Sequence, residues 1–254
     1  TQLGGLMTST AAFATVAGVD VGVDLSAALI DVNAGITSAG LEIELTSSNG
    51  LTIDGGNITT TGGSNQAGGN IDIDVTNGNT TINSSLMAKG GTTTGTNAAT
   101  AGGAVTIDTG NDDTVSIAAV NINTSGTVAS GTDQASAVGG AVTITTGNDA
   151  LITLGGTTIT TTQGAATGAG TATATGGTVT FADPVSLTNS GVTITTGATT
   201  GGSINFQNTL NGAQTLELTA GSGNIDFTGK VGNGETLGKV TISNAGTITT
   251  VDTF

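Results

Sequence analysis

Residues 139–144 read Gly-Gly-Ala-Val-Thr-Ile, a pair of glycines followed by alternating apolar and polar residues. The same kind of step returns at residues 68–73, 102–107, 176–181 and 201–206. Apolar residues at every second position predict a β-strand with one buried face. Self-similarity at intervals of roughly 20 to 50 residues indicates a repeat architecture, in which each unit buries its apolar face by stacking on its neighbours. The sequence therefore predicts a stack of β-strand coils.

The second glycine of each step marks the start of a coil. Successive starts lie 34, 37, 37 and 25 residues apart, at Gly69, Gly103, Gly140, Gly177 and Gly202. Further segments fit the same frame, from Gly18 and Gly40 upstream and from Gly223 downstream. A core coil of about 21 residues, with insertions of up to about 16 residues, accounts for all of these intervals.

Each coil contains three short strands separated by turn residues. In the coil that starts at Gly140 we expect strands at residues 142–144, 151–154 and 158–160, with turns at 147–149 and 155–156. The strands show β-branched residues in alternation, and the turns are rich in Gly, Asn and Asp. Three strands per coil predict a triangular cross-section with Val and Ile stacked inside.

Three insertions fall at one place in the coil, after the third strand, at residues 90–101, 126–138 and 163–175. They consist mainly of Thr, Ala, Gly and Ser without an apolar period, and insertions in a solenoid collect on one side. Two interpretations stand. The insertions are tolerated surface loops, or they form a lateral surface through which neighbouring fibres pack side by side.

The chain has few charged residues, and most of them are acidic. Of 254 residues only 8% are charged, and 18 acidic residues against three lysines give a formal charge of −15. Binding to nucleic acid or to anionic membranes depends on clustered Lys and Arg. We therefore expect neither partner. Regularly spaced Val and Ile, with a mean hydropathy of +0.22, also argue against charge-driven disorder.

The first residue favours an exported protein. The chain has no Cys and no apolar run near the roughly 18 residues of a membrane span, so we expect no disulfide framework and no membrane insertion. Residue 1 is Thr and not Met. We therefore expect that a signal peptide or a longer precursor was removed, and that the protein is secreted to the extracellular space or the cell surface.

The pattern resembles the filamentous haemagglutinin family of secreted bacterial β-helical proteins. The resemblance runs from about Gly18 to the end, and it is carried by the Gly-Gly-x-Val-x-Ile steps, by residues 220–232 (AGSGNIDFTGKVG) and by residues 237–242 (LGKVTI). It implies a right-handed β-helix exported as an adhesin shaft, fibre or sheath. The expected fold is thus all-β, a single-stranded, three-sided, right-handed parallel β-helix of about eight coils.

Two regions are expected: residues 1–17 as an amino-terminal cap or strand-exchange segment, and residues 18–254 as the solenoid. The first region is apolar without the coil pattern. It is either a capping turn or short helix, which repeat arrays need for solubility, or a strand that inserts into a neighbouring subunit. The residues that we expect at end contacts between copies are Leu3, Leu6, Met7, Phe13, Val251 and Phe254.

The chain lacks most of the residue types used in acid–base and nucleophilic catalysis, because it contains no His, Cys, Arg, Tyr or Trp. Paired carboxylates remain, since glycosidases act through Asp and Glu. Sugar subsites also normally offer aromatic platforms, and here only 2% of residues are aromatic, all of them Phe. We expect no enzyme and favour solvated outer faces for the candidate pairs, which are Asp72 with Asp74, Asp112 with Asp113, and Glu42 with Glu44.

Two acidic turns make calcium a candidate ligand. Residues 110–113 (GNDD) and 147–149 (GND) occupy equivalent turns one coil apart, and carboxylates suit a hard cation. Asp112, Asp113 and Asp149 are the candidate ligands. Neither turn matches the Gly-rich calcium-binding nonapeptide. The favoured interpretation is that Asn and Asp are present because they tolerate left-handed turns, so we expect no cofactor.

Thr-x-Thr steps at residues 158–160, 193–195 and 247–249 make ice binding an alternative, because they could build flat hydroxyl ladders. Thr is, however, also an ordinary outward residue of strands. The function that we expect is structural. The protein is an extracellular β-solenoid that associates with copies of itself, end to end and side by side, in a fibre, sheath or adhesin shaft. No motif identifies a host receptor or glycan.

Overall fold

The computed structural model describes residues 2–3, 7–9 and 21–251. Over these residues the chain is a parallel β-solenoid whose three sheets run along its whole length, because each strand pairs with the equivalent strand of the next coil. The described part also contains one short 3₁₀ turn, Gly147–Asp149. None of its residues forms a helix with the length and hydropathy of a membrane span.

Each coil visits the three sheets in the same order, and the sheets are named first, second and third accordingly. The nine strands of the first sheet are β3 (Val21–Ala27), β6 (Glu42–Ser47), β9 (Ile71–Val75), β12 (Val105–Thr109), β15 (Val142–Thr146), β18 (Val179–Phe181), β21 (Ile204–Phe206), β24 (Ile225–Phe227) and β26 (Ile248–Thr250). The eight strands of the second sheet are β1 (Gln2–Leu3), β4 (Ile30–Val32), β7 (Leu51–Ile53), β10 (Thr80–Ile82), β13 (Val115–Ala118), β16 (Ile152–Gly155), β19 (Val185–Leu187) and β22 (Leu210–Asn211). The nine strands of the third sheet are β2 (Met7–Ser9), β5 (Ile36–Ser38), β8 (Ile58–Thr59), β11 (Leu86–Met87), β14 (Asn121–Asn123), β17 (Thr158–Thr160), β20 (Val192–Thr195), β23 (Leu216–Thr219) and β25 (Val240–Asn244).

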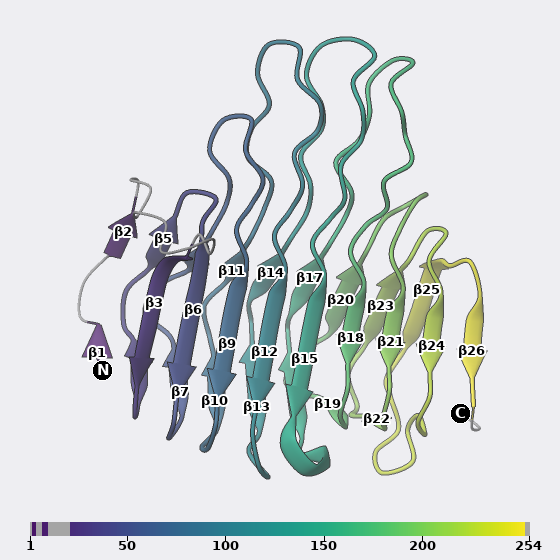
Figure 1. Cartoon of the computed structure of the whole chain (residues 1–254). Coiled ribbons are helices and arrows are strands. Elements are labelled where there is room, and N and C mark those ends of the chain that lie inside the picture. Colours follow the sequence, from purple (N-terminus) through teal and green to yellow (C-terminus); the bar gives the residue numbers. More distant parts are fainter. Residues whose placement is uncertain (1, 4–6, 10–20, 252–254) are drawn as a thin grey trace.

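The expected three-sided, right-handed β-helix is confirmed. In Figure 1 the strands of the first sheet run downward in front and those of the third sheet run upward behind, while the chain advances from the N to the C label. That path is a right-handed coil, the handedness that parallel crossover connections prefer. Strands β3 to β23 make seven complete coils, and β24, a bridge between Leu210 and Val231, and β25 make an eighth.

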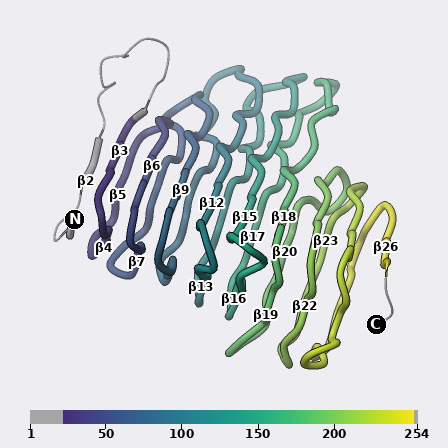
Figure 2. Tube along the Cα trace, turned by 60° about the horizontal axis from the view of Figure 1, so that its bottom comes forward, coloured from purple at the N-terminus to yellow at the C-terminus, as the bar shows by residue number. Residues whose placement is uncertain are grey.

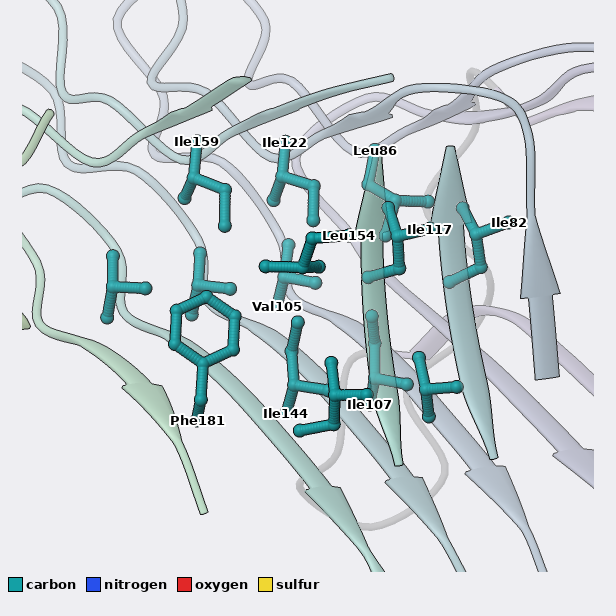
Figure 3. Close-up of a cluster of buried hydrophobic side chains, with 14 of the residues drawn as sticks. Ile82, Leu86, Val105, Ile107, Ile117, Ile122, Ile144, Leu154, Ile159 and Phe181 are labelled. Carbon is teal, nitrogen blue, oxygen red and sulfur yellow. The ribbon is translucent and has the colours of Figure 1, made fainter. Parts of the chain in front are cut away.

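The core is a set of apolar columns that run along the solenoid axis. On the first sheet Ile73, Ile107 and Ile144 are register partners on adjacent strands, and each is at most 1% exposed. Residues between them on the same strands point outward. Figure 3 shows side chains from all three sheets meeting in the interior. Because side chains alternate between faces, this register buries every Val and Ile of the Gly-Gly steps.

Near the C-terminal end, one of these columns consists of phenylalanine side chains. Phe181 is the register partner of Ile144, and the rings of Phe181, Phe206 and Phe227 stack with centroids 5.0 and 5.4 Å apart. The ring planes are nearly parallel, at 14° and 6°. Parallel in-register strands about 4.8 Å apart impose this stacked arrangement on identical side chains.

The predicted coil starts agree with the structure where they fall on described residues, and Gly18 lies outside them. The first-sheet strands of five coils begin at Ile71, Val105, Val142, Val179 and Ile204, two residues after the predicted starts. One start was missed: Gly246 precedes β26 by two residues and opens a further coil. It lacks the paired glycine, and no second-sheet strand is described after β26.

The described parts of the amino-terminal region pair with their own chain. Gln2–Leu3 and Met7–Ser9 lie parallel to β4 and β5 and extend the second and third sheets. Leu3 and Met7 therefore lie in strands. Leu6, Phe13 and Phe254, three of the expected contact residues, fall outside the described residues. The role of residues 1–17 as a cap or an exchange segment stays a prediction.

Replacing Ile107 with Ala tests the core columns. Ile107 is fully buried between Ile73 and Ile144, so the cavity should lower the free energy of unfolding by about 2–5 kcal/mol. Urea unfolding followed by circular dichroism measures it. Thr106→Ala, on the outer face of the same strand, is the control and should change the value by less than about 1 kcal/mol. Equal effects of the two substitutions would contradict the assigned register.

Candidate functional site

The three long insertions project from one side of the solenoid as a layered fin. We call residues 90–101, 126–138 and 163–175 the fin arms. Each arm leaves the coil after a third-sheet strand, as predicted, and returns to the next first-sheet strand. Figure 1 shows them rising together above the sheets, and Figure 2 shows them gathered along one edge. The fin is the largest departure from the three-sided body.

A buried threonine closes the base of most insertions. Thr124 directly follows β14, and its Oγ1 donates to the carbonyl oxygen of Gly140 at 2.6 Å, while the Gly140 N–H donates back to the Thr124 carbonyl at 2.7 Å. The same reciprocal pair joins Thr60 to Gly69 and Thr161 to Gly177. We call this pair of hydrogen bonds the neck. It spans 9 to 16 residues of chain, so the coil keeps its frame whatever the insertion length.

The paired glycines are needed because backbones approach closely at the neck. A Cβ on Gly140 would lie 1.9 Å from the carbonyl oxygen of Gly103, and one on Gly177 would lie 1.9 Å from that of Gly140. The first glycine is equally confined, since a Cβ on Gly139 would lie 2.0 Å from the Thr161 carbonyl oxygen. Only a residue without a side chain fits such positions.

The arms bond to one another through their backbones. Between the first and second arms, the N–H groups of Ala99 and Ser130 donate to the carbonyls of Ala135 and Asn97 at 3.0 Å. Opposed limbs also form isolated antiparallel bridges, Thr100 with Thr127 and Ala137 with Gly164. The arms are therefore an ordered layer, which goes beyond the first interpretation of them as tolerated loops.

The outer face of the first sheet is acidic in its N-terminal half. The register places Asp24 beside Glu44, Glu44 beside Asp72, and Asp74 beside Asp108. A shallow hollow of about 330 Å³ lies among four of these carboxylates and Thr106. The expected outward orientation of Glu42 with Glu44 and of Asp72 with Asp74 is thus observed, across strands as well as along them.

Two of these carboxyl groups have raised pKa values. The pKa of Glu42 rises to about 7, first because its side chain hydrogen-bonds to Asp72, then because of partial burial and the charge of Asp72. Partial desolvation, with the charges of Asp74 and Asp183, raises the pKa of Asp108. Carboxyl groups joined by a hydrogen bond are closer than the roughly 5 Å that retaining glycosidases keep between theirs, so Glu42 and Asp72 share a proton instead.

The candidate calcium ligands make other contacts. Asp113 Oδ2 accepts a hydrogen bond from the Gly78 N–H at 2.6 Å, and Asp149 Oδ1 accepts one from Asn208 Nδ2 at 2.9 Å. Asn111, Asn148 and Asp149 adopt positive φ, as the turn interpretation expects. Within the described ranges, no three His, Cys, Asp or Glu side chains lie close enough to hold a metal ion, so Asp112 has no such cluster to join.

The Thr-x-Thr steps do not share one face. Thr158 and Thr160 on β17 are register partners of Thr193 and Thr195 on β20 in the third sheet. The step at residues 247–249 lies instead at the first sheet, where Thr249 pairs with Asp226. On the third sheet the next partner of Thr195 is Thr219, but the next partner of Thr193 is Glu217, so the array contains five threonines before a carboxylate interrupts it. Ice binding stays a prediction, and this small array is the surface that it would use.

Comparison with known proteins adds no identity: no protein-family model, curated protein or solved structure matches this chain. The parallel β-solenoid itself rests on the sheets described above.

Thr161→Val tests the neck. The substitution keeps the side-chain shape but leaves the buried Gly177 carbonyl without the hydroxyl donor, so the free energy of unfolding should fall by about 1–3 kcal/mol. Thr80→Val is a matched control, because Thr80 is also fully buried but its hydroxyl has no hydrogen-bond partner. That control should be neutral or stabilising by up to about 1 kcal/mol. Urea titrations of both variants compare them, and equal losses would argue against the neck.

Glu42→Gln tests the shared proton. A raised pKa means that the folded protein keeps a proton on Glu42 between pH 4.5 and about 7, where the unfolded chain has lost it. Wild-type stability should therefore fall as pH rises through this window, and the variant should lose less. Melting temperatures from pH 4 to pH 8 measure the difference. Glu235→Gln, at an exposed turn, controls for the loss of one charge, and parallel pH curves for wild type and Glu42→Gln would contradict the proton sharing.

Proposed function

We propose that this protein is an extracellular structural solenoid, a subunit or segment of a bacterial cell-surface fibre, sheath or adhesin shaft that associates end to end with copies of itself. The observation that carries the proposal is the continuous parallel pairing of strands in three sheets along the described chain. Such a stack extends in one direction only, and its terminal strands present backbone groups that pair readily with another chain.

The C-terminal coils supply apolar surface for such a contact. Leu237, Val240 and Ile242 are only partly buried, and Val251, one of the expected end-contact residues, is 70% exposed. A hollow of about 230 Å³ lies among Val231, Leu237 and Val240. Apolar groups that pack fully in the middle of the solenoid are thus left half-covered here, and a neighbouring coil would bury them at a gain of about 25 cal/mol per Å².

The two ends also differ in their charged residues. Lys230 and Lys239, two of the three cations of the chain, lie in the last coils together with Glu217, Asp226 and Glu235, whereas the first two coils carry carboxylates such as Asp24, Asp31 and Glu44 and no lysine. Lysines at one end that meet carboxylates at the other favour a head-to-tail contact, in which different surfaces of each copy meet, and a contact of that kind repeats into a filament. The charge of the body as a whole, −15, opposes random side-on association.

The resemblance to the filamentous haemagglutinin family adds a biological setting. It rests on the repeat style, including residues 220–232 and 237–242, and members of that family are exported shafts. The near absence of lysine and the absence of Arg leave few sites for trypsin-like proteases, which suits an exposed fibre. Secretion, the cell surface and a bacterial origin all belong to this proposal.

Fibre formation is the direct test. Purified protein concentrated at about 0.15 M salt should form filaments visible by negative-stain microscopy, with a diffraction repeat near 4.8 Å along the fibre axis. Reversing both C-terminal cations, Lys230→Glu with Lys239→Glu, should shorten the filaments and weaken their dependence on salt. Lys89→Glu, mid-chain, is the matched control and should leave filament length unchanged. Particles that stay single rods at every concentration would contradict end-to-end association.

A further inference from the structure

The last arm of the fin, residues 163–175, has an open edge on its C-terminal side. Two hydrogen bonds reach across this side, from Gln163 Nε2 to Thr200 Oγ1 and from the Gly176 N–H to the Thr200 carbonyl. Between these two points, no hydrogen bond of the described chain joins residues 164–175 to residues 197–201 or beyond. The reason is length: the next insertion, at 197–201, is too short to reach the upper part of the arm.

This edge borders a hollow of about 240 Å³ whose walls are mostly small. Ala165, Gly168, Gly170 and Ala172 line it together with Ser136 and Thr199. Ala172 is exposed. Side chains this small leave the backbone N–H and C=O groups of the arm accessible to another extended chain, the situation in which exposed edges recruit partners.

The rest of the fin shows what covers an edge of this kind. The equivalent edge of the second arm is covered by the third arm, through bonds from the N–H groups of Ser136 and Ala137 to the carbonyls of Thr171 and Gly164 and from the Thr167 N–H to the Gln134 carbonyl. The first arm is covered by the second in the same way. The segment that fits such an edge is therefore another extended, Gly- and Ala-rich arm.

Charge favours a second copy as the source of that arm. Arms 90–101 and 163–175 contain no charged residue, and arm 126–138 contains one, Asp133. Its Oδ1 accepts a hydrogen bond from the Ala169 N–H within the fin. In a protein of net charge −15 the fin is therefore a surface on which two copies can meet without opposing carboxylates.

We propose that two copies pair through arm 163–175 about a two-fold axis, with the two arms antiparallel at their open edges. A second copy in the same orientation cannot fill the edge, because the coils from β18 to β26 continue beneath it (Figure 1) and would collide with the first coils of that copy. A copy turned by the two-fold places its solenoid beyond the arm tips. Antiparallel pairing is already used inside the fin, between Ala137 and Gly164.

The contact deepens the proposed self-association and rests on it for its role in a fibre. End-to-end stacking lengthens one filament, whereas fin pairing joins two filaments side by side. Because a two-fold contact uses the same patch on both copies, it closes after two and cannot by itself form a long assembly.

Single cysteines map this contact, since the chain has no Cys of its own. Cysteine is placed in turn at Ala165, Ala166, Ala172 and Ala174. At one or more of these positions, mild oxidation or a short bis-maleimide should give covalent dimers. The reason is that a two-fold axis brings a residue near the axis close to the same residue of the second copy. Thr96→Cys and Ala98→Cys, exposed on the first arm and separated from the open edge by the second arm, are the controls and should stay monomeric. If the control positions cross-link as strongly as the four positions on arm 163–175, the assigned edge is wrong.

Ala172→Asp is the companion test by sedimentation velocity. Facing aspartates across the two-fold should weaken the dimer by about tenfold or more in Kd, with circular dichroism unchanged. Thr96→Asp adds the same charge to the first arm, away from the open edge, and should leave Kd unchanged. Monomers up to about 1 mM for the unmodified protein, or equal Kd for the two variants, would overturn fin pairing. If Ala172→Asp abolishes the dimer but filaments still form, only fin pairing depends on this edge and end-to-end association stands. If fin dimers form but filaments do not, fin pairing stands and the end-to-end proposal fails.

Discussion

Parallel pairing between successive coils is the constraint on which the rest of this structure depends. Each strand is held by the strand one coil before and one coil after, so a residue keeps its sheet, its face and its neighbours through the whole stack. A shift of one residue would turn every Val and Ile of a strand outward. The apolar columns, the stacked phenylalanines and the acidic face all follow from that register, because each is a column of equivalent positions.

The second constraint is the close approach of backbones at the neck. The paired glycines lie where the returning chain passes directly over the neck of the adjacent coil, and a threonine hydroxyl satisfies the glycine carbonyl there. Because the neck closes most of the insertions locally, length added outside it does not change the register inside. The coils can therefore stay constant while the insertions vary from a short turn to a long arm.

These two constraints divide the surface into parts with different physical character. The first sheet concentrates carboxylates that crowd one another enough to share a proton between Glu42 and Asp72. The fin is almost free of charge and built from small residues, and two of the three lysines lie in the last coils. We propose contacts between copies at the ends and at the fin because repulsion between carboxylates is weakest there.

The sequence alone determined the strand positions, the three-sided coil, the coil starts and the place of the insertions, because all of these are expressed in local alternation and in glycine spacing. The start at Gly246 was missed because it lacks the second glycine. Tertiary structure alone decided which distant residues meet. Thr124 and Gly140 are 16 residues apart, and nothing in their local pattern predicts their hydrogen bonds. Three other features depend likewise on the register between coils, which the spacing of residues along the sequence does not specify. They are the separation of the Thr-x-Thr steps between two sheets, the ordering of the arms into one layer and the pairing of Glu42 with Asp72.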